Sequence, residues 1–116
     1  MLSNSGINKV LLLGQITGDP FINNTNRTEN YLCFVLVTNE VIKKGTDNVG
    51  HNEYHKIRIP EKLLQQEAIS LQEGQTIFIE GKIHTTTMID EQRIKRYNLE
   101  VVASKVELIS MVPVAI

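Results

Sequence analysis

Short apolar runs separated by turn-forming residues follow one another along most of this 116-residue chain. The first run, 10–16, is apolar on both faces and contains Gly14, which is typical of a strand that bends while packing on two sides. The tripeptide Gly18-Asp19-Pro20 predicts the turn that ends it. A polar loop is expected at 23–30, and a second strand at 31–38.

Strict alternation of apolar and polar residues predicts a third strand at 54–59. One face of this strand carries His55, Ile57 and Ile59, and the opposite face carries Tyr54, Lys56 and Arg58. The preceding stretch, 43–52, is rich in Gly, Asn and Asp, which predicts a mobile loop between the second and third strands.

The only predicted helix is 61–71, which begins after Pro60 and ends before a possible cap at Gly74. Its apolar stripe consists of Leu64, Ala68 and Leu71. Alternation predicts a fourth strand at 76–84, with its apolar face made by Ile77, Ile79, Gly81 and Ile83. A polar hairpin arm at 85–95 and a last strand at 97–109 complete the series.

The order of three strands, one helix and two strands predicts an all-β protein, a five-stranded OB-fold barrel whose helix closes one end. An SH3-like barrel usually lacks that helix, and a ferredoxin-like fold would need two. We expect one domain at 1–110, followed by a short apolar C-terminal extension at 111–116.

Composition and charge exclude several classes of protein but do not select a partner. The chain has 12 Lys and Arg against 13 Asp and Glu, so any affinity for nucleic acid must come from where the cations lie. The single Cys33 allows no internal disulfide, and no Cys or His pair has zinc-site spacing. With no signal peptide or 20-residue apolar run, we expect a soluble protein of a reducing compartment without metal or cofactor.

Catalytic motifs are not found in the sequence. The three imidazoles, on His51, His55 and His84, accompany no nucleophile motif, and no Gly-rich loop precedes the helix. The adjacent Asp90 and Glu91 fall in the predicted arm, where a solvated turn is the ordinary interpretation. The sequence therefore predicts a binding protein and not an enzyme.

The outward face of the third strand places one ring and two cations in a line, at Tyr54, Lys56 and Arg58. Grooves that bind single-stranded nucleic acid combine stacking rings with cations in this way, although an ordinary solvated strand face would show the same pattern. Further cations lie in the two segments expected to flank this face, namely Lys43, Lys44, Arg93, Lys95 and Arg96.

Five sequence blocks occur in the order and spacing of a known family: Ile7–Gly14, Gly18–Pro20, Thr38–Glu40, Glu53–Lys56 and Ile79–Ile83. In these blocks the chain resembles the bacterial and mitochondrial single-stranded-DNA-binding proteins, from about Ile7 to Ile109. The resemblance implies sequence-independent binding and protection of single-stranded DNA during replication, repair and recombination. It also implies a homotetramer, with a homodimer as the alternative, and contact with replication and repair proteins.

The resemblance also assigns individual residues. His55 and an exposed Phe78 are expected near subunit contacts, and Lys9, Lys82 and Met88 join the predicted DNA-binding set. The expected location is the cytoplasm, at the bacterial nucleoid, with the mitochondrial matrix as the alternative.

This chain departs from the family at the positions where bases usually stack, which here are Ile42, Tyr54, Pro60 and Met88. Because only Tyr54 is aromatic and each stacked base is worth about 1–3 kcal/mol, we expect weaker or more electrostatic binding than the family norm. Bacterial members also usually carry an acidic C-terminal tail, whereas the residues at 111–116 are apolar. A replication-restart (primosomal) or accessory OB protein that acts mainly through protein contacts is therefore the alternative function.

Overall fold

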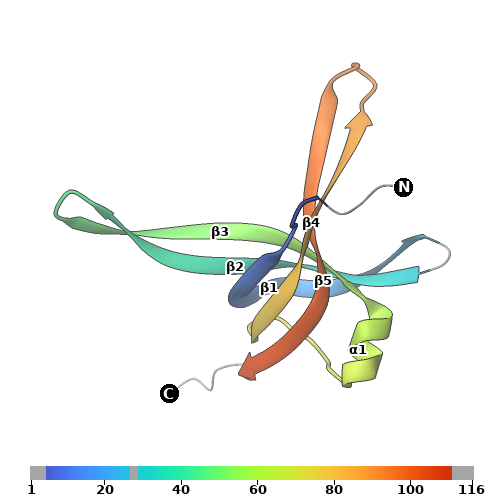
Figure 1. Ribbon diagram of the computed structural model, residues 1–116, viewed down its shortest axis with the longest axis horizontal. Helices are drawn as coiled ribbons and strands as arrows, with labels where there is room; N and C mark the ends of the chain where they lie inside the picture. The colour runs from blue at the N-terminus through green and yellow to red at the C-terminus, as the bar shows by residue number, and fades with distance from the viewer. Residues whose placement is uncertain (1–4, 27–28, 111–116) are drawn as a thin grey trace.

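The computed structural model describes residues 5–26 and 29–110. Five strands, β1 to β5, form a closed barrel in the order β1-β2-β3-β5-β4, with one helix, α1, after β3 (Figure 1). Their bounds are β1 Val10–Asn26, β2 Glu29–Lys44, β3 Asp47–Pro60, α1 Glu61–Glu67, β4 Thr76–Ile89 and β5 Lys95–Ser110. The predicted five-stranded OB barrel is confirmed. The predicted extension at 111–116 lies outside the described residues.

The expected end of the first strand is wrong, because β1 continues past Gly18-Asp19-Pro20 to Asn26. The register against β2 shifts between Thr17 and Phe21, and Gly18 has a φ of 74°, so the turn-forming residues make a bulge inside the strand. Most of the loop expected at 23–30 is therefore strand.

The mobile loop expected at 43–52 is a β-hairpin. β2 and β3 stay in unbroken register out to the pair Lys44 and Asp47, and Gly45, with a φ of 64°, lies in the turn that joins them. The arm predicted at 85–95 is confirmed as the end of the β4–β5 hairpin. The two arms leave the barrel in different directions (Figure 1).

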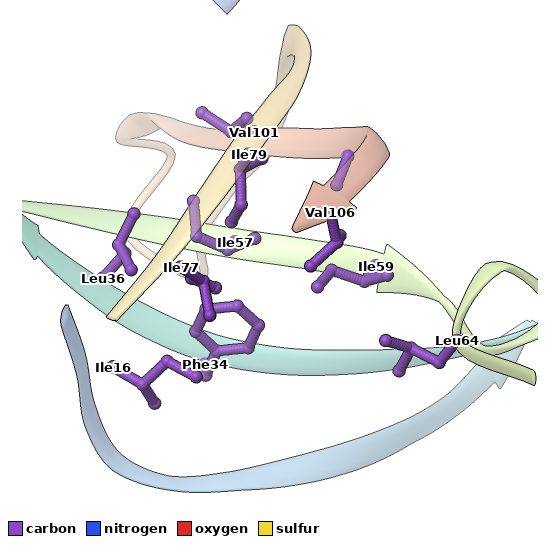
Figure 2. Close-up of a cluster of buried hydrophobic side chains, with 11 residues drawn as sticks. Ile16, Phe34, Leu36, Ile57, Ile59, Leu64, Ile77, Ile79, Val101 and Val106 are labelled. Atoms are coloured by element: carbon purple, nitrogen blue, oxygen red, sulfur yellow. The ribbon is translucent and has the colours of Figure 1, made fainter. Parts of the chain in front are cut away.

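The helix is shorter than expected. It ends at Glu67 because Ala68 takes a left-handed conformation with a φ of 53°, so the predicted cap at Gly74 is wrong. The Gly74 N–H instead donates to the Ile16 carbonyl at 2.9 Å, which ties the segment before β4 to β1. Leu64 is the buried residue of the helix and packs at one end of the core (Figure 2).

The core fills the barrel with side chains from all five strands and the helix (Figure 2). The predicted inward positions Ile57 and Ile77 are 1% and 0% exposed, whereas Ile83 is 42% exposed because β4 has left the barrel there and entered the arm. The buried members of this core cluster are Ile16, Phe34, Leu36, Ile57, Ile59, Leu64, Ile77, Ile79, Val101, Ala103 and Val106.

Candidate nucleic-acid interface

The outward face of β3 has the predicted composition. Tyr54 is 65% exposed and Lys56 is exposed, while Ile57 and Ile59 point into the core. The alternation of side chains that the sequence predicted is therefore present in the structure. Whether these outward residues bind DNA stays a prediction.

The two cations of this face are held by β5. Lys56 Nζ donates to Asn98 Oδ1 at 3.1 Å, and Arg58 forms an ion pair with Glu100 at 3.7 Å. Arg58 also lies over the Tyr31 ring, 4.4 Å from its centre. Arg58 is thus half-buried and largely neutralised, and Lys56 is the more available cation.

Sequence reasoning missed Asn98 and Glu100, since both come from β5, which meets β3 only where the barrel closes through a short parallel pairing. No local pattern in the sequence marks such a contact. Glu100 changes the electrostatics of the face, because it places a carboxylate beside the predicted cations.

A groove of about 590 Å³ lies on the outer side of the sheet, between β1 and the β3–β5 junction. Cys33 and Val35 of β2 lie in its lining, with Phe21 of β1 on one side and Lys56 and Asn98 on the other. Burial, with the nearby Glu100 carboxylate, raises the pKa of the Cys33 thiol above its ordinary value. The groove thus combines an apolar floor with polar groups from several strands.

Phe21 is another groove residue that has no place in the sequence-based prediction. Its side chain is 60% exposed, and it pairs with Cys33 across the β1–β2 ladder. The available signal was the alternation after Pro20, but Gly18-Asp19-Pro20 was interpreted as the end of the strand. A strand that runs through these residues places Phe21 on the outer face.

The cations predicted to flank the face are not gathered beside it. Lys43 and Lys44 lie at the end of the β2–β3 arm, and Lys44 is seven ladder positions beyond the pair made by Val37 and Tyr54, or about 23 Å at 3.3 Å per residue. On the β4–β5 arm, Arg93 lies in the turn with a φ of 61°. The β2–β3 cations are therefore far from Tyr54.

Two cations of the β4–β5 arm have partners of their own. Arg96 Nε donates to Asp90 Oδ2 at 2.9 Å, and Lys95 Nζ lies 5.4 Å from the centre of the Tyr97 ring. Met88, 65% exposed, pairs with Arg96, so both lie on the arm face that also carries Asn98. This arm face therefore continues the face that bears the groove.

Lys9 and Lys82 line a different hollow, of about 490 Å³, that shares no lining residue with the groove. Lys9 forms an ion pair with Glu80 at 3.6 Å. The Asn8 side-chain amide donates to the Ile83 carbonyl at 2.8 Å, and Asn8 Oδ1 accepts from the Ile83 N–H at 2.9 Å. These two hydrogen bonds continue the β1–β4 pairing beyond Val10. The structure does not bring these two lysines to the face of Tyr54.

The two residues predicted for subunit contacts differ in their surroundings. His55 Nε2 lies 2.9 Å from Thr38 Oγ1 in a hydrogen bond and is half-buried. Phe78, expected to be exposed, is half-buried within the single chain. It lies on the outer face of the β1–β4 pair, opposite Leu13. Leu11 and Leu13 on the same face are 57% and 58% exposed. Their place in an assembly stays a prediction.

Among the described residues, no cluster of three His, Cys, Asp or Glu is arranged to hold a metal ion. No helix in the described part of the chain has the length and apolar character needed to span a bilayer.

A closed OB barrel with a ring, a cation and an apolar groove on one outer face defines a class of nucleic-acid-binding modules. Residues 7–109 match the profile described as the single-strand binding protein family. The chain belongs to this family, and the family resemblance stated from the sequence is confirmed.

Several curated relatives carry the family's name. The chain is 29% identical over 106 residues to single-stranded DNA-binding protein 1 of Chlorobaculum tepidum, covering 90% of this chain and 65% of that protein. It is 30% identical over 105 residues to the single-stranded DNA-binding protein of Xylella fastidiosa, covering 90% of this chain and 64% of the relative. The chain thus spans about two thirds of the length of these relatives.

Solved structures show the same fold. The chain is similar to a Plasmodium falciparum SSB in complex with ssDNA, with a TM-score of 0.78, 18% identity and coverage of 94% of this chain and 100% of the other. It is also similar to a deletion mutant of the single-stranded DNA binding protein of Thermus aquaticus, with a TM-score of 0.76, 22% identity and coverage of 90% and 51%. At these identities the likeness supports the barrel itself.

Proposed function

We propose that this chain binds single-stranded DNA without sequence preference and protects it during replication, repair and recombination. The observation that carries the proposal is the exposed Tyr54–Lys56 face beside an apolar groove, on an OB barrel of the single-strand binding protein family. Rings stack on any base and cations attract any phosphate, so such a face recognises the polymer and not its sequence.

The restart-factor alternative is not favoured. The family profile is described as the single-strand binding protein family, and the two curated relatives compared above are named single-stranded DNA-binding proteins. Strong binding of a replication protein together with negligible DNA affinity would reverse this preference.

A titration of fluorescent oligonucleotides at two salt concentrations tests the proposal. We expect tight binding to poly-dT and poly-dA strands, weak binding to the duplex, and an affinity that falls as salt rises. Alanine at Tyr54, Lys56 and Arg58 together should weaken binding at least tenfold, about 1.4 kcal/mol. Lys62→Ala changes an exposed lysine on α1 that lies outside the face, so it controls for the loss of a cation elsewhere on the protein and should bind DNA like the wild type. Equal binding to single and double strands would overturn the proposal.

We further propose that the chain assembles as a homotetramer, with a homodimer as the alternative outcome. The support is the apolar outer face of the β1–β4 pair, where Leu11 and Leu13 remain exposed beside Phe78. Light scattering coupled to size exclusion should give a mass near four times 13.1 kDa. Leu13→Glu should lower that mass, and a monomeric wild-type protein would overturn the proposal.

A further inference from the structure

Phe21 is an exposed aromatic residue whose place in the fold calls for an explanation. Its ring has no polar atom, yet the side chain is 60% exposed on the outer face of β1. Cys33 pairs with Phe21 on one side and with Arg58 on the other, so these three side chains form a row across the sheet. The row crosses the face that carries Lys56.

The bulge in β1 sets which residue of β2 lies beside Phe21. Thr17 pairs with Val35 and Phe21 pairs with Cys33, so the bulge adds two residues to β1. Phe21 therefore stays on the outer side of the strand, with Thr17, and is placed next to Cys33. The Gly18 N–H donates to Glu73 Oε2 at 3.0 Å, which holds the bulge in place. Ile22 pairs with Leu32, which packs against the core, so Ile22 lies on the other side of the strand.

The chemistry of the groove favours a base over a phosphate. Its lining includes the apolar side chains of Phe21 and Val35 and the carboxylates of Asp19 and Glu100. Carboxylates repel phosphate but accept hydrogen bonds from the amines and ring N–H groups of bases. Lys56 lines the groove from β3, two strands from Phe21, or about 10 Å at the usual strand spacing. A nucleotide can therefore place its base near the ring and its phosphate toward the ammonium group.

We propose that Phe21 is a base-stacking residue of the single-strand interface, with the base held in the groove between Phe21 and Lys56. The inference rests on the proposed function. Phe21 would add a ring to an interface in which three of the family's usual stacking positions, Ile42, Pro60 and Met88, are not aromatic. Two rings, on β1 and β3, would then hold a strand that runs across β2, since Tyr54 lies on the same outer side of the sheet.

Three substitutions separate stacking from simple apolar contact. Phe21→Ala removes the ring and the apolar area, Phe21→Leu keeps much of the area without the ring, and Phe21→Trp keeps a ring. Loss of one stacked base lowers affinity by about 5- to 150-fold, so we expect Phe21→Ala and Phe21→Leu to weaken binding of a labelled poly-dT strand in that range. The protein contains no Trp, so Phe21→Trp also creates its single indole, whose emission should be quenched as DNA is added.

Ile22→Ala is the matched control, because Ile22 is the neighbouring apolar residue, 46% exposed, on the opposite side of β1. It should bind DNA like the wild type, and melting curves should show every variant folded. If the wild type binds DNA and Phe21→Ala binds equally well, the inference fails while the proposed function stands. Equal binding by Phe21→Leu, or unquenched emission from Phe21→Trp with bound DNA, would also overturn stacking. A wild type that binds no single strand overturns both.

Discussion

At the scale of single residues, the Arg58–Glu100 pair limits how much charge the face presents. Its side chains are 25% and 18% exposed, and Arg58 also covers the Tyr31 ring. A partly buried pair fixes its members in place and leaves little net charge toward an approaching phosphate. The structure therefore makes Arg58 a support of the face more than a free cation, which the alternation of residues in β3 did not reveal.

We expect Glu100→Gln to raise affinity for single-stranded DNA by about two- to fivefold at low salt, because it removes a carboxylate from the groove and releases Arg58. The gain should shrink at high salt, where screening weakens the charge. The free energy of unfolding should fall by about 1 kcal/mol or less. Oligonucleotide titrations and urea melts measure both, with Glu67→Gln on α1 as the control of equal charge change. Unchanged low-salt affinity would contradict this role for Glu100.

At the scale of elements, two strands of the barrel approach too closely for any side chain at Gly14. A Cβ atom there would clash with the main-chain carbonyl oxygen of Val37 on β2, which cannot move without breaking the ladder. We therefore expect Gly14→Ala to lower the free energy of unfolding by about 1–3 kcal/mol, the usual cost of overpacking. Gly50→Ala, on the β2–β3 arm with nothing within 4 Å, is the control and should change stability by about 0.5 kcal/mol or less. Chemical denaturation of both variants makes the comparison, and equal stability would refute the close approach.

The turn of the β4–β5 arm depends on one carboxylate. Asp90 Oδ1 accepts from the main-chain N–H groups of Gln92 and Ile94, both at 2.9 Å, and Oδ2 accepts from Arg96. The hydrogen bond from Ile94, with those from Arg96 and Gln92, lowers the pKa of Asp90 below that of an ordinary aspartate. The charged form is thus favoured in the folded turn.

The pKa of Asp90 is lower in the folded protein than in the unfolded chain, where it is about 4. The charged carboxylate therefore stabilises the turn fully above about pH 4, and this stabilisation is lost as the pH falls through the pKa of the folded state. We expect the amide resonances of Gln92 and Ile94 to shift together below about pH 4, with faster amide exchange. NMR spectra recorded across this range measure the change, and Asp90→Asn should remove the pH dependence. Resonances that stay constant in the wild type down to about pH 2 would show that the carboxylate does not hold the turn.

At the scale of the whole molecule, local patterns predicted the barrel because strand order, the position of the helix and inward residues such as Ile57 all leave a periodic signal. They failed where pairing between distant segments overrode local turn chemistry. Gly18 lies in a bulge inside β1, and the glycines around Asp47 lie in the β2–β3 arm. In both places pairing with β2 supplies hydrogen-bond partners for the main chain, so the strand continues through residues that favour turns. The groove needs β1, β2, β3 and β5 together, so Asn98 had no sequence signal of its own, and the alternation that includes Phe21 was obscured by the turn-forming residues before it.

The separation of the arms from the groove predicts a binding strength that depends on strand length. Lys43 and Lys44 lie six and seven ladder positions from Tyr54, about 20 and 23 Å along the strand. A DNA strand of about 5 nucleotides centred on the groove should therefore not reach them, whereas one of about 30 should. Replacing both lysines by Ala should leave short-strand affinity unchanged. For the long strand it should reduce the salt slope by about 1.4, or 0.7 for each lost phosphate contact.

Titrations of both strand lengths over a salt series make the comparison, with Lys62→Ala as the control for each. Equal weakening on short and long strands would mean that the arm folds back toward the groove in the complex. No weakening on either would mean that the strand leaves the barrel along the β4–β5 arm instead. That arm face carries Arg96 and Met88 beside Asn98, and it would then supply the remaining contacts to the backbone.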